Sequence, residues 1–101
     1  MERTLQLLQE NPRDPIALMS LYGNYDTEFR EIAIRYFGSG QVADKVTLSL
    51  LVIVASRVWT WDPSTDPDRW IVQCGDSEAS RLRAALDTTK MVMEISNDRT
   101  V

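Results

Sequence analysis

The apolar residues that follow Asp14 recur at intervals of three and four, which is the period of an α-helix. Asp14 can cap a helix, and Pro15 suits the first helical position because its backbone angle is fixed. The apolar positions that share this period are Leu18, Leu21, Tyr22, Tyr25, Phe29, Ile32, Ala33 and Tyr36. The pattern predicts a helix over Pro15–Phe37. Gly38 ends it, since glycine tolerates a left-handed backbone conformation.

A shorter helix is predicted before it. The segment TLQLLQE, residues 4–10, places Leu5 and Leu8 on one side. Asn11-Pro12 stops this helix, because the residue before a proline is pushed out of the helical conformation.

The next segment, VADKVTLSLLVIVASRVW (residues 42–59), can be interpreted in two ways. Its β-branched content fits a buried strand, but a lone strand would have no partner unless the C-terminal tail supplied one. A helix over Gln41–Trp59 would pack on the preceding helix, and we favour it. One side of this helix holds Leu48, Leu51, Val52, Ala55 and Trp59, and another holds Val46, Leu50, Ile53 and Val54. Little polar surface remains, so the helix is either central to the fold or exposes an apolar strip to a partner.

A third long helix is predicted after Asp66, which can cap it. Pro67 is its first residue, and Asp68 is favourable at the positive end of the helix dipole. Its inward residues are predicted to be Trp70, Ile71, Cys74, Leu82, Ala85 and Leu86. In the tail, residues 88–101, the alternation of Met91, Met93 and Ile95 leaves three alternatives open: a strand, a frayed helical end or a docking segment.

Together these elements predict an all-α fold. It is a bundle of three principal helices with a short N-terminal helix over residues 1–87, followed by a tail whose structure the pattern leaves open. The predicted core consists of Leu21, Tyr25, Phe29, Leu50, Ile53, Val54, Trp70 and Ile71. All three tryptophans fall within WTWDPSTDPDRW, residues 59–70, and we expect their rings to pin the corner between two helices.

Composition and charge narrow the function classes. The 101 residues carry a net charge of −4, which argues against wrapping nucleic acid. With no histidine and only Cys74, the chain cannot form an internal disulfide, a Cys/His zinc site or an imidazole-based catalytic site. We expect Cys74 to be a small buried hydrophobe. No metal or cofactor is expected.

The aspartates of the 59–70 segment, such as Asp62 and Asp66, are explained as turn and helix caps rather than acid–base partners. GSG at residues 38–40 lacks the lysine of a phosphate loop. We therefore expect no enzyme. The N-terminal sequence has no signal-peptide pattern and no apolar run of about 20 residues occurs, so a cytoplasmic protein without membrane contact is expected.

Three segments carry motifs in a recognisable order. NPRDPIALMSLYGNYDTEFREIAIRYFG (residues 11–38) has an Asp-Pro start, a Leu-Tyr pair and a second tyrosine. VADKVTLSLLVIVASRVWTWDP (residues 42–63) ends at an aromatic-Asp-Pro turn. DPDRWIVQCGDSEASRLRAAL (residues 66–86) begins with a tryptophan-led helix and ends in an arginine-rich run. In order and spacing, nearly the whole chain resembles the region-2 domain of extracytoplasmic-function sigma factors, the bacterial subunits that bring RNA polymerase to promoters.

The chain departs from that family where the family contacts polymerase. The resemblance implies a polar set that grips a coiled coil of the polymerase clamp: two acids, then Gln and Glu one turn later. Here Asp44, Lys45, Leu48 and Ser49 occupy those places. One charge is reversed and the Gln-Glu pair has lost its hydrogen-bonding groups, a loss that is costly at an interface.

The third helix also departs from the family, whose basic and polar residues there hold the non-template DNA strand. Asp76 and Glu78 occupy the central turn of this segment. The remaining candidate nucleic-acid-binding residues are Trp61, Arg69, Trp70, Arg81 and Arg83. We expect DNA binding to be weak or absent.

No region-4-like pattern follows in this sequence, so we expect a stand-alone sigma domain or a sigma-like fold with a changed use. Our main interpretation is a sigma-factor-like helical protein in transcription regulation. It would act through a protein partner, which is itself as a homodimer, RNA polymerase or a regulator. The candidate partner-binding residues are Leu48, Ser49, Leu51, Val52, Ala55 and Trp59. The alternative is a genuine transcription-initiation component that binds RNA polymerase and promoter DNA.

Overall fold

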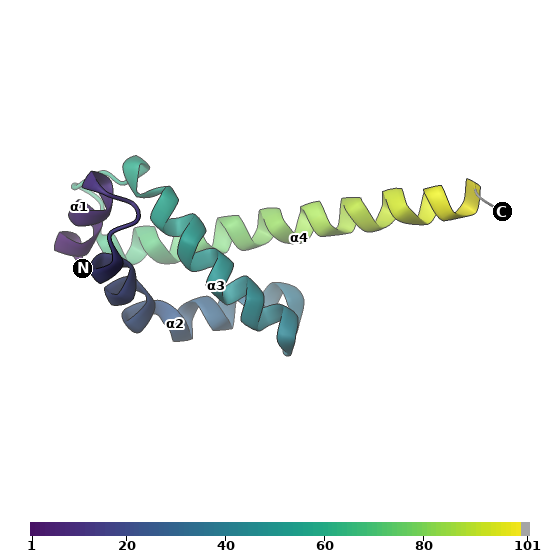
Figure 1. Cartoon of the computed structure of the whole chain (residues 1–101), viewed down its shortest axis with the longest axis horizontal. Helices are drawn as coiled ribbons and strands as arrows, with labels where there is room; N and C mark the ends of the chain where they lie inside the picture. The colour runs from purple at the N-terminus through teal and green to yellow at the C-terminus, as the bar shows by residue number, and fades with distance from the viewer. Residues whose placement is uncertain (100–101) are drawn as a thin grey trace.

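The computed structural model describes the backbone of residues 1–99 and the side chains of residues 1–91. Within these residues the chain forms α1 (Glu2–Glu10), α2 (Pro15–Phe37), α3 (Gln41–Ser56), the short 3-10 helix η1 (Val58–Thr60) and α4 (Pro67–Arg99) (Figure 1). No strand occurs in residues 1–99. The all-α prediction is confirmed, and residues 48–54 are helical rather than a strand.

The predicted helix ends are confirmed where local hydrogen bonds set them. The Asp14 carboxylate accepts hydrogen bonds from the backbone N–H groups of Ile16 and Ala17, at 3.0 and 3.1 Å, and so caps α2. Gly38 follows the end of α2 with a φ of 76°, a value that glycine adopts without strain. At the start of α4, the Asp66 carboxylate accepts from the backbone N–H of Arg69 at 3.0 Å.

The predicted end of α3 is wrong by one turn. The helix ends at Ser56 rather than at Trp59, and the chain continues into η1, where Val58 is buried. A contact from α1 accompanies this change of direction: the Gln9 side-chain amide donates to the backbone carbonyls of Val58 and Trp61, at 3.0 and 3.1 Å. A residue about fifty positions away in the sequence therefore helps to fix this corner.

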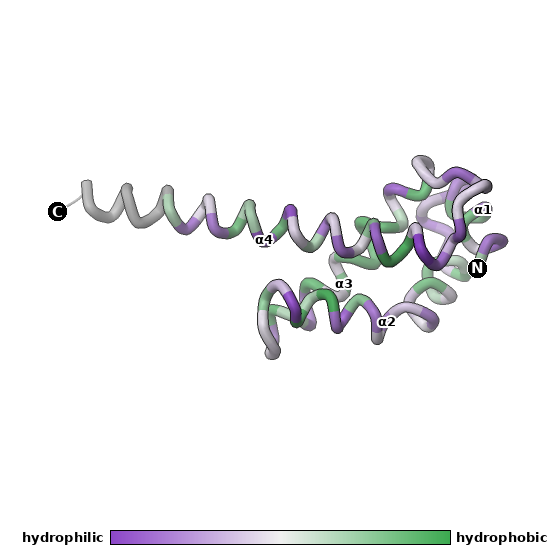
Figure 2. The backbone as a smooth tube through the Cα atoms, turned by 180° about the vertical axis from the view of Figure 1, so that it is seen from behind, coloured by the Kyte–Doolittle hydropathy of each residue, from purple (hydrophilic) through white to green (hydrophobic). Residues whose placement is uncertain are grey.

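The core lies between α2, α3 and α4, with α1 packed on α2 and η1 at one end (Figure 1). Hydrophobic positions recur along α3 where it lies between its neighbours (Figure 2). The core residues are Leu5, Leu8, Ala17, Leu21, Tyr25, Phe29, Ile32, Leu50, Val54, Ala55, Val58, Trp61, Ile71 and Ala79. Of the predicted core, Ile53 and Trp70 are only half-buried. Trp70 packs against the edge of the core.

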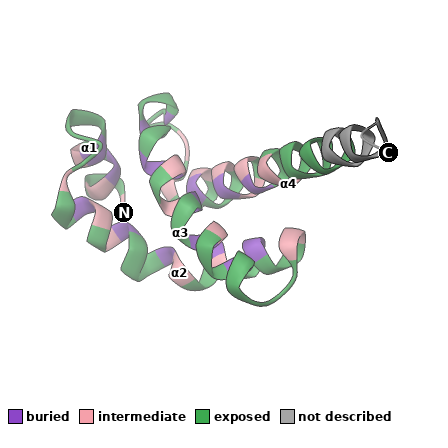
Figure 3. Ribbon diagram, turned by 45° about the vertical axis from the view of Figure 1, so that its right-hand side comes forward, coloured by how far each residue is buried: buried purple, intermediate pink, exposed green. Residues whose placement is uncertain are grey.

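Helix α4 extends well past the bundle (Figure 1). Leu82 is half-buried against the core, whereas Ala85 and Leu86, predicted to point inward, are exposed. The bundle has ended by this point, and every described side chain from 84 to 91 is exposed (Figure 3). The tail is helical through Arg99, so its strand alternative is wrong for residues 91–99. Residues 100 and 101 lie outside the described part.

No helix in the described part of the chain is both long enough and apolar enough to cross a membrane.

Candidate partner-binding surface

The outward side of α3 carries two exposed apolar residues. Leu48 and Val52 are four residues apart, so they lie one above the other on the same side of the helix. Leu48 is 55% exposed and Val52 is 64% exposed. We call this pair the α3 ridge. The inward side of the same helix is buried through Ala43, Thr47, Leu50, Val54 and Ala55.

A groove runs along one side of the α3 ridge, between α3 and α4. It has a volume of about 450 Å³ and is lined by Leu48, Ser49, Val52, Ile53 and Leu82. We call it the α3/α4 groove. None of its lining residues is charged. The α3 ridge is therefore one wall of an apolar groove.

A second groove lies on the other side of α3, against α2. It has a volume of about 360 Å³ and is lined by Leu18, Met19, Tyr22 and Leu51. We call it the α2/α3 groove. Its lining is also free of charged residues. Helix α3 lines both grooves, and α2 and α4 each contribute apolar side chains to one of them.

The structure brings some of the predicted partner-binding residues together and separates others. Leu48, Ser49 and Val52 share the α3/α4 groove, and Leu51 is half-buried in the α2/α3 groove. Ala55 is buried in the core, so it cannot contact a partner. Trp59 is highly exposed, but it lies in η1 beyond the end of α3 rather than on the helix.

Sequence reasoning missed the contributions from the other two helices. Leu18, Met19 and Tyr22 were not predicted to face a partner, and Ile53 and Leu82 were assigned inward positions. The signal for this surface was present in α2, because its apolar stripe is wider than one buried side requires: Leu18 and Leu21 are accompanied by Ile16, Met19 and Tyr22.

The candidate nucleic-acid-binding residues do not form an open stacking face. Trp61 is only 3% exposed, and its ring N–H donates to the Thr65 carbonyl at 3.1 Å. A buried ring cannot stack on a base, so this prediction is wrong for Trp61. Trp70 is half-buried against the core, and Arg69 is exposed.

Arg81 and Arg83, two of the candidate nucleic-acid-binding residues, have acidic partners within α4. Arg81 lies 3.4 Å from the Glu78 carboxylate, and Arg83 lies 3.3 Å from Asp87. Arg83 also sits over the Phe37 ring, 5.9 Å from its centroid. Arg69 is twelve residues before Arg81, which is about 18 Å along a helix. The three arginines are therefore spread along α4.

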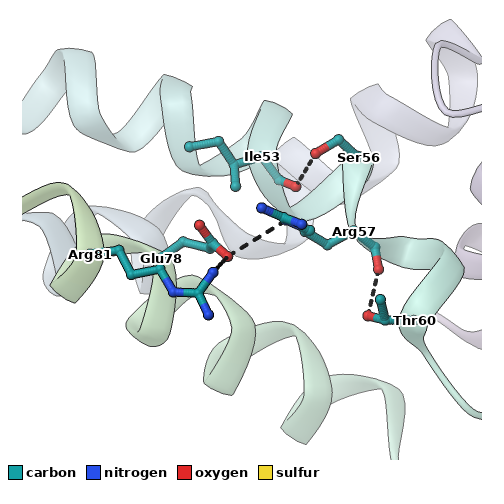
Figure 4. A network of polar contacts seen from close by, with 6 residues as sticks. All are labelled: Ile53, Ser56, Arg57, Thr60, Glu78 and Arg81. Atoms are coloured by element: carbon teal, nitrogen blue, oxygen red, sulfur yellow. Dashed lines mark hydrogen bonds and ion pairs between the residues drawn. The ribbon is translucent and has the colours of Figure 1, made fainter.

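Asp76 and Glu78 connect the helices of the bundle. Asp76 lies 2.9 Å from the guanidinium of Arg35 on α2. Glu78 is largely buried and lies between Arg57, at 3.7 Å, and Arg81 (Figure 4). Arg57 immediately follows α3, so Glu78 joins the end of that helix to α4. These acids, which the sequence marked as unfavourable for DNA, also stabilise the packing of α4.

The thiol of Cys74 is unsuited to nucleophilic chemistry. Burial, with a smaller effect from Glu78, raises the pKa of the Cys74 thiol to about 11. The thiol therefore stays protonated at neutral pH. Among the residues whose placement is described, no group of three His, Cys, Asp or Glu side chains is arranged to hold a metal ion.

A polar cleft of about 520 Å³ lies elsewhere, between α1, α2 and α4. Its lining includes Thr4, Ser20, Asn24, Tyr25 and Asp68. Most of these groups have partners already: the Tyr25 hydroxyl donates to the Asp68 carboxylate, the Thr4 and Ser20 hydroxyls are 3.3 Å apart, and Asn24 donates to the Ser20 carbonyl. The cleft serves the packing of α1, and we place the candidate site on α3.

Compared with known protein families, curated proteins and solved structures, the chain gives no match in any of the three comparisons.

Proposed function

We propose that this chain is a sigma-factor-like helical protein that acts in transcription regulation through protein–protein contacts, with the α3 ridge and its two grooves as the contact surface. One observation carries the mode of action: Leu48 and Val52 are more than half exposed between grooves whose lining holds no charge. Exposed apolar side chains beside uncharged grooves are typical of a protein interaction site.

The assignment to transcription is supported by the order and spacing of the three sigma-like motifs. The residues at the polymerase-contact places support a changed use of that surface. Asp44 forms a salt bridge with Arg30 of the same chain, so its charge is already partly compensated. Leu48 and Ser49 take part in an apolar groove instead of a hydrogen-bonding one. The contact we propose is therefore driven by apolar burial rather than by charge pairing.

A promoter-binding role has less support. Stacking on single-stranded DNA needs exposed aromatic rings beside free cationic groups. Trp61 is buried, and Arg81 and Arg83 have acidic neighbours. These features favour protein contact over DNA contact.

The proposal is tested with purified bacterial RNA polymerase, as core enzyme and as holoenzyme with a primary sigma factor. A photo-crosslinking amino acid replaces Val52, and promoter-dependent transcription is measured with and without the chain. We expect a cross-link from position 52 to a polymerase subunit or to the sigma factor, together with a changed transcript yield. Leu48→Asp in the chain that carries the cross-linker should lose the cross-link, and Leu48→Asp/Val52→Asp should lose the effect on transcript yield.

Two results would contradict the proposal. The first is the absence of any cross-link to the transcription proteins together with an unchanged transcript yield. The second is promoter-specific initiation by core enzyme and this chain alone, because that result identifies a genuine initiation factor.

A further inference from the structure

We propose that a second copy of this chain covers the α3 ridge, in a two-fold symmetric dimer. In this dimer Leu48 and Val52 of each copy enter the α3/α4 groove of the other. The inference rests on the proposed function because it concerns the same surface: the second copy covers position 52 until the dimer dissociates, and the transcription proteins bind the monomer.

The shape of the surface supports self-association. A two-fold interface uses the same patch on both copies, so the patch must hold both a projection and a matching hollow. Here Leu48 and Val52 form the projecting α3 ridge and also one wall of the α3/α4 groove. Leu82 of α4 lines the same groove. Side chains of one helix pack into the groove beside another in this manner. The two-fold symmetry therefore repeats one contact: the ridge of each copy packs into the groove of the other.

The charge distribution also supports a second copy. Two copies with a net charge of −4 repel each other, so a contact between them is favoured where it adds no like charges at the interface. Neither groove is lined by a charged residue. A basic partner, in contrast, would find no acid in the lining of either groove to pair with.

A standard interface buries roughly 800 Å² on each partner, which is about an eighth of the 6811 Å² that this chain exposes. The centre of the proposed contact is apolar, and polar residues such as Asp44 and Lys45 lie beside it, as expected for a hydrophobic core with a polar rim.

The test is the mass of the chain in solution, measured by sedimentation equilibrium over a range of concentrations. We expect the wild type to approach twice its 11.5 kDa and to dissociate on dilution. Leu48→Asp/Val52→Asp should weaken association at least tenfold with an unchanged helical circular dichroism signal. The control is Leu86→Asp/Met91→Asp, which adds the same charge to exposed apolar positions on α4 outside the grooves. It should remain dimeric.

Three results would overturn the inference: a monomeric wild type up to millimolar concentration, a ridge variant that folds and associates unchanged, or dissociation by the α4 control alone. If the aspartate variant fails to fold, Leu48→Ser/Val52→Ser decides the question, since it introduces no charge. A folded serine variant that dissociates supports the dimer, and one that associates like the wild type rejects it.

The polymerase cross-link separates this inference from the proposed function. A monomer whose position 52 cross-links to the transcription proteins rejects the dimer and leaves the proposed function standing. A dimer that depends on Leu48 and Val52, without any contact to the transcription proteins, supports the dimer and rejects the proposed function.

Discussion

The Tyr36 hydroxyl on α2 donates a hydrogen bond of 3.1 Å to the Oδ2 atom of Asp76 on α4. The other carboxylate oxygen, Oδ1, accepts from Arg35 at 2.9 Å. One acid on α4 therefore contacts two consecutive residues near the end of α2. The hydrogen bond to Asp76, followed by burial and the negative charge of Asp76, raises the pKa of Tyr36 above its ordinary value.

This relationship predicts an alkaline titration. A tyrosine with a raised pKa in the folded state holds its proton more tightly there than in the unfolded chain. Its contribution to stability is present below the unfolded pKa of about 10 and is lost as the pH rises through the folded pKa. Measured by phenolate absorbance, Tyr36→Phe should remove one late-ionising group, and Asp76→Asn should lower its pKa. The contact is not formed if the group lost in Tyr36→Phe titrates at an ordinary tyrosine pKa, or if Asp76→Asn leaves the titration curve unchanged.

Cys74 should react slowly with alkylating reagents. Its pKa of about 11, against an ordinary 9.0, lowers the thiolate fraction about 100-fold at pH 8. The rate constant with iodoacetamide should therefore be about 100-fold smaller for the folded chain than for the chain in urea. A mass spectrometric time course measures both rates. Equal rates would mean that the thiol is exposed and unshifted.

Trp61 and Trp59 should differ sharply in their effect on stability. Trp61 is 3% exposed and Trp59 is 72% exposed, although they are two residues apart. Truncating a buried tryptophan typically costs about 3–5 kcal/mol. Trp61→Ala should show a loss of that size in urea denaturation followed by circular dichroism, whereas Trp59→Ala should stay within about 0.5 kcal/mol of the wild type. Comparable losses would contradict the difference in burial between the two rings, which leaves Trp61 rather than Trp59 packed at this corner.

The two helical glycines should respond in opposite directions to alanine. A Cβ atom at Gly75 would lie 3.0 Å from the Phe29 ring, which is fully buried and has little room to shift. A Cβ atom at Gly23 has no neighbour within 4 Å. Glycine costs a helix about 1 kcal/mol relative to alanine, while overpacking a core costs about 1–3 kcal/mol.

We therefore expect Gly23→Ala to raise the free energy of unfolding by up to about 1 kcal/mol. Gly75→Ala should lower it, because the clash exceeds the gain in helix propensity. Thermal and urea unfolding of both variants measure the difference. Stabilisation by Gly75→Ala would show that the Phe29 ring has room to shift away from α4.

The sequence by itself determined the helices that begin and end through local interactions. Asp14 and Pro15 start α2, and Asp66 and Pro67 start α4, because the capping carboxylate reaches backbone N–H groups only two or three residues ahead. The glycine that ends α2 needs no distant partner either. Such features depend on a few neighbouring residues, so a single sequence is enough to predict them.

Only the tertiary structure decided which apolar residues of α3 are buried. Its sequence is apolar on nearly every side, so helical periodicity cannot separate the exposed Leu48 and Val52 from the buried Leu50 and Val54. That separation depends on where α2 and α4 lie. Trp59 is exposed and Trp61 is buried at a corner that the Gln9 side chain of α1 also contacts, through the Trp61 carbonyl. Contacts between residues far apart in the chain thus formed the candidate site, because periodicity within one helix does not encode the position of its neighbours.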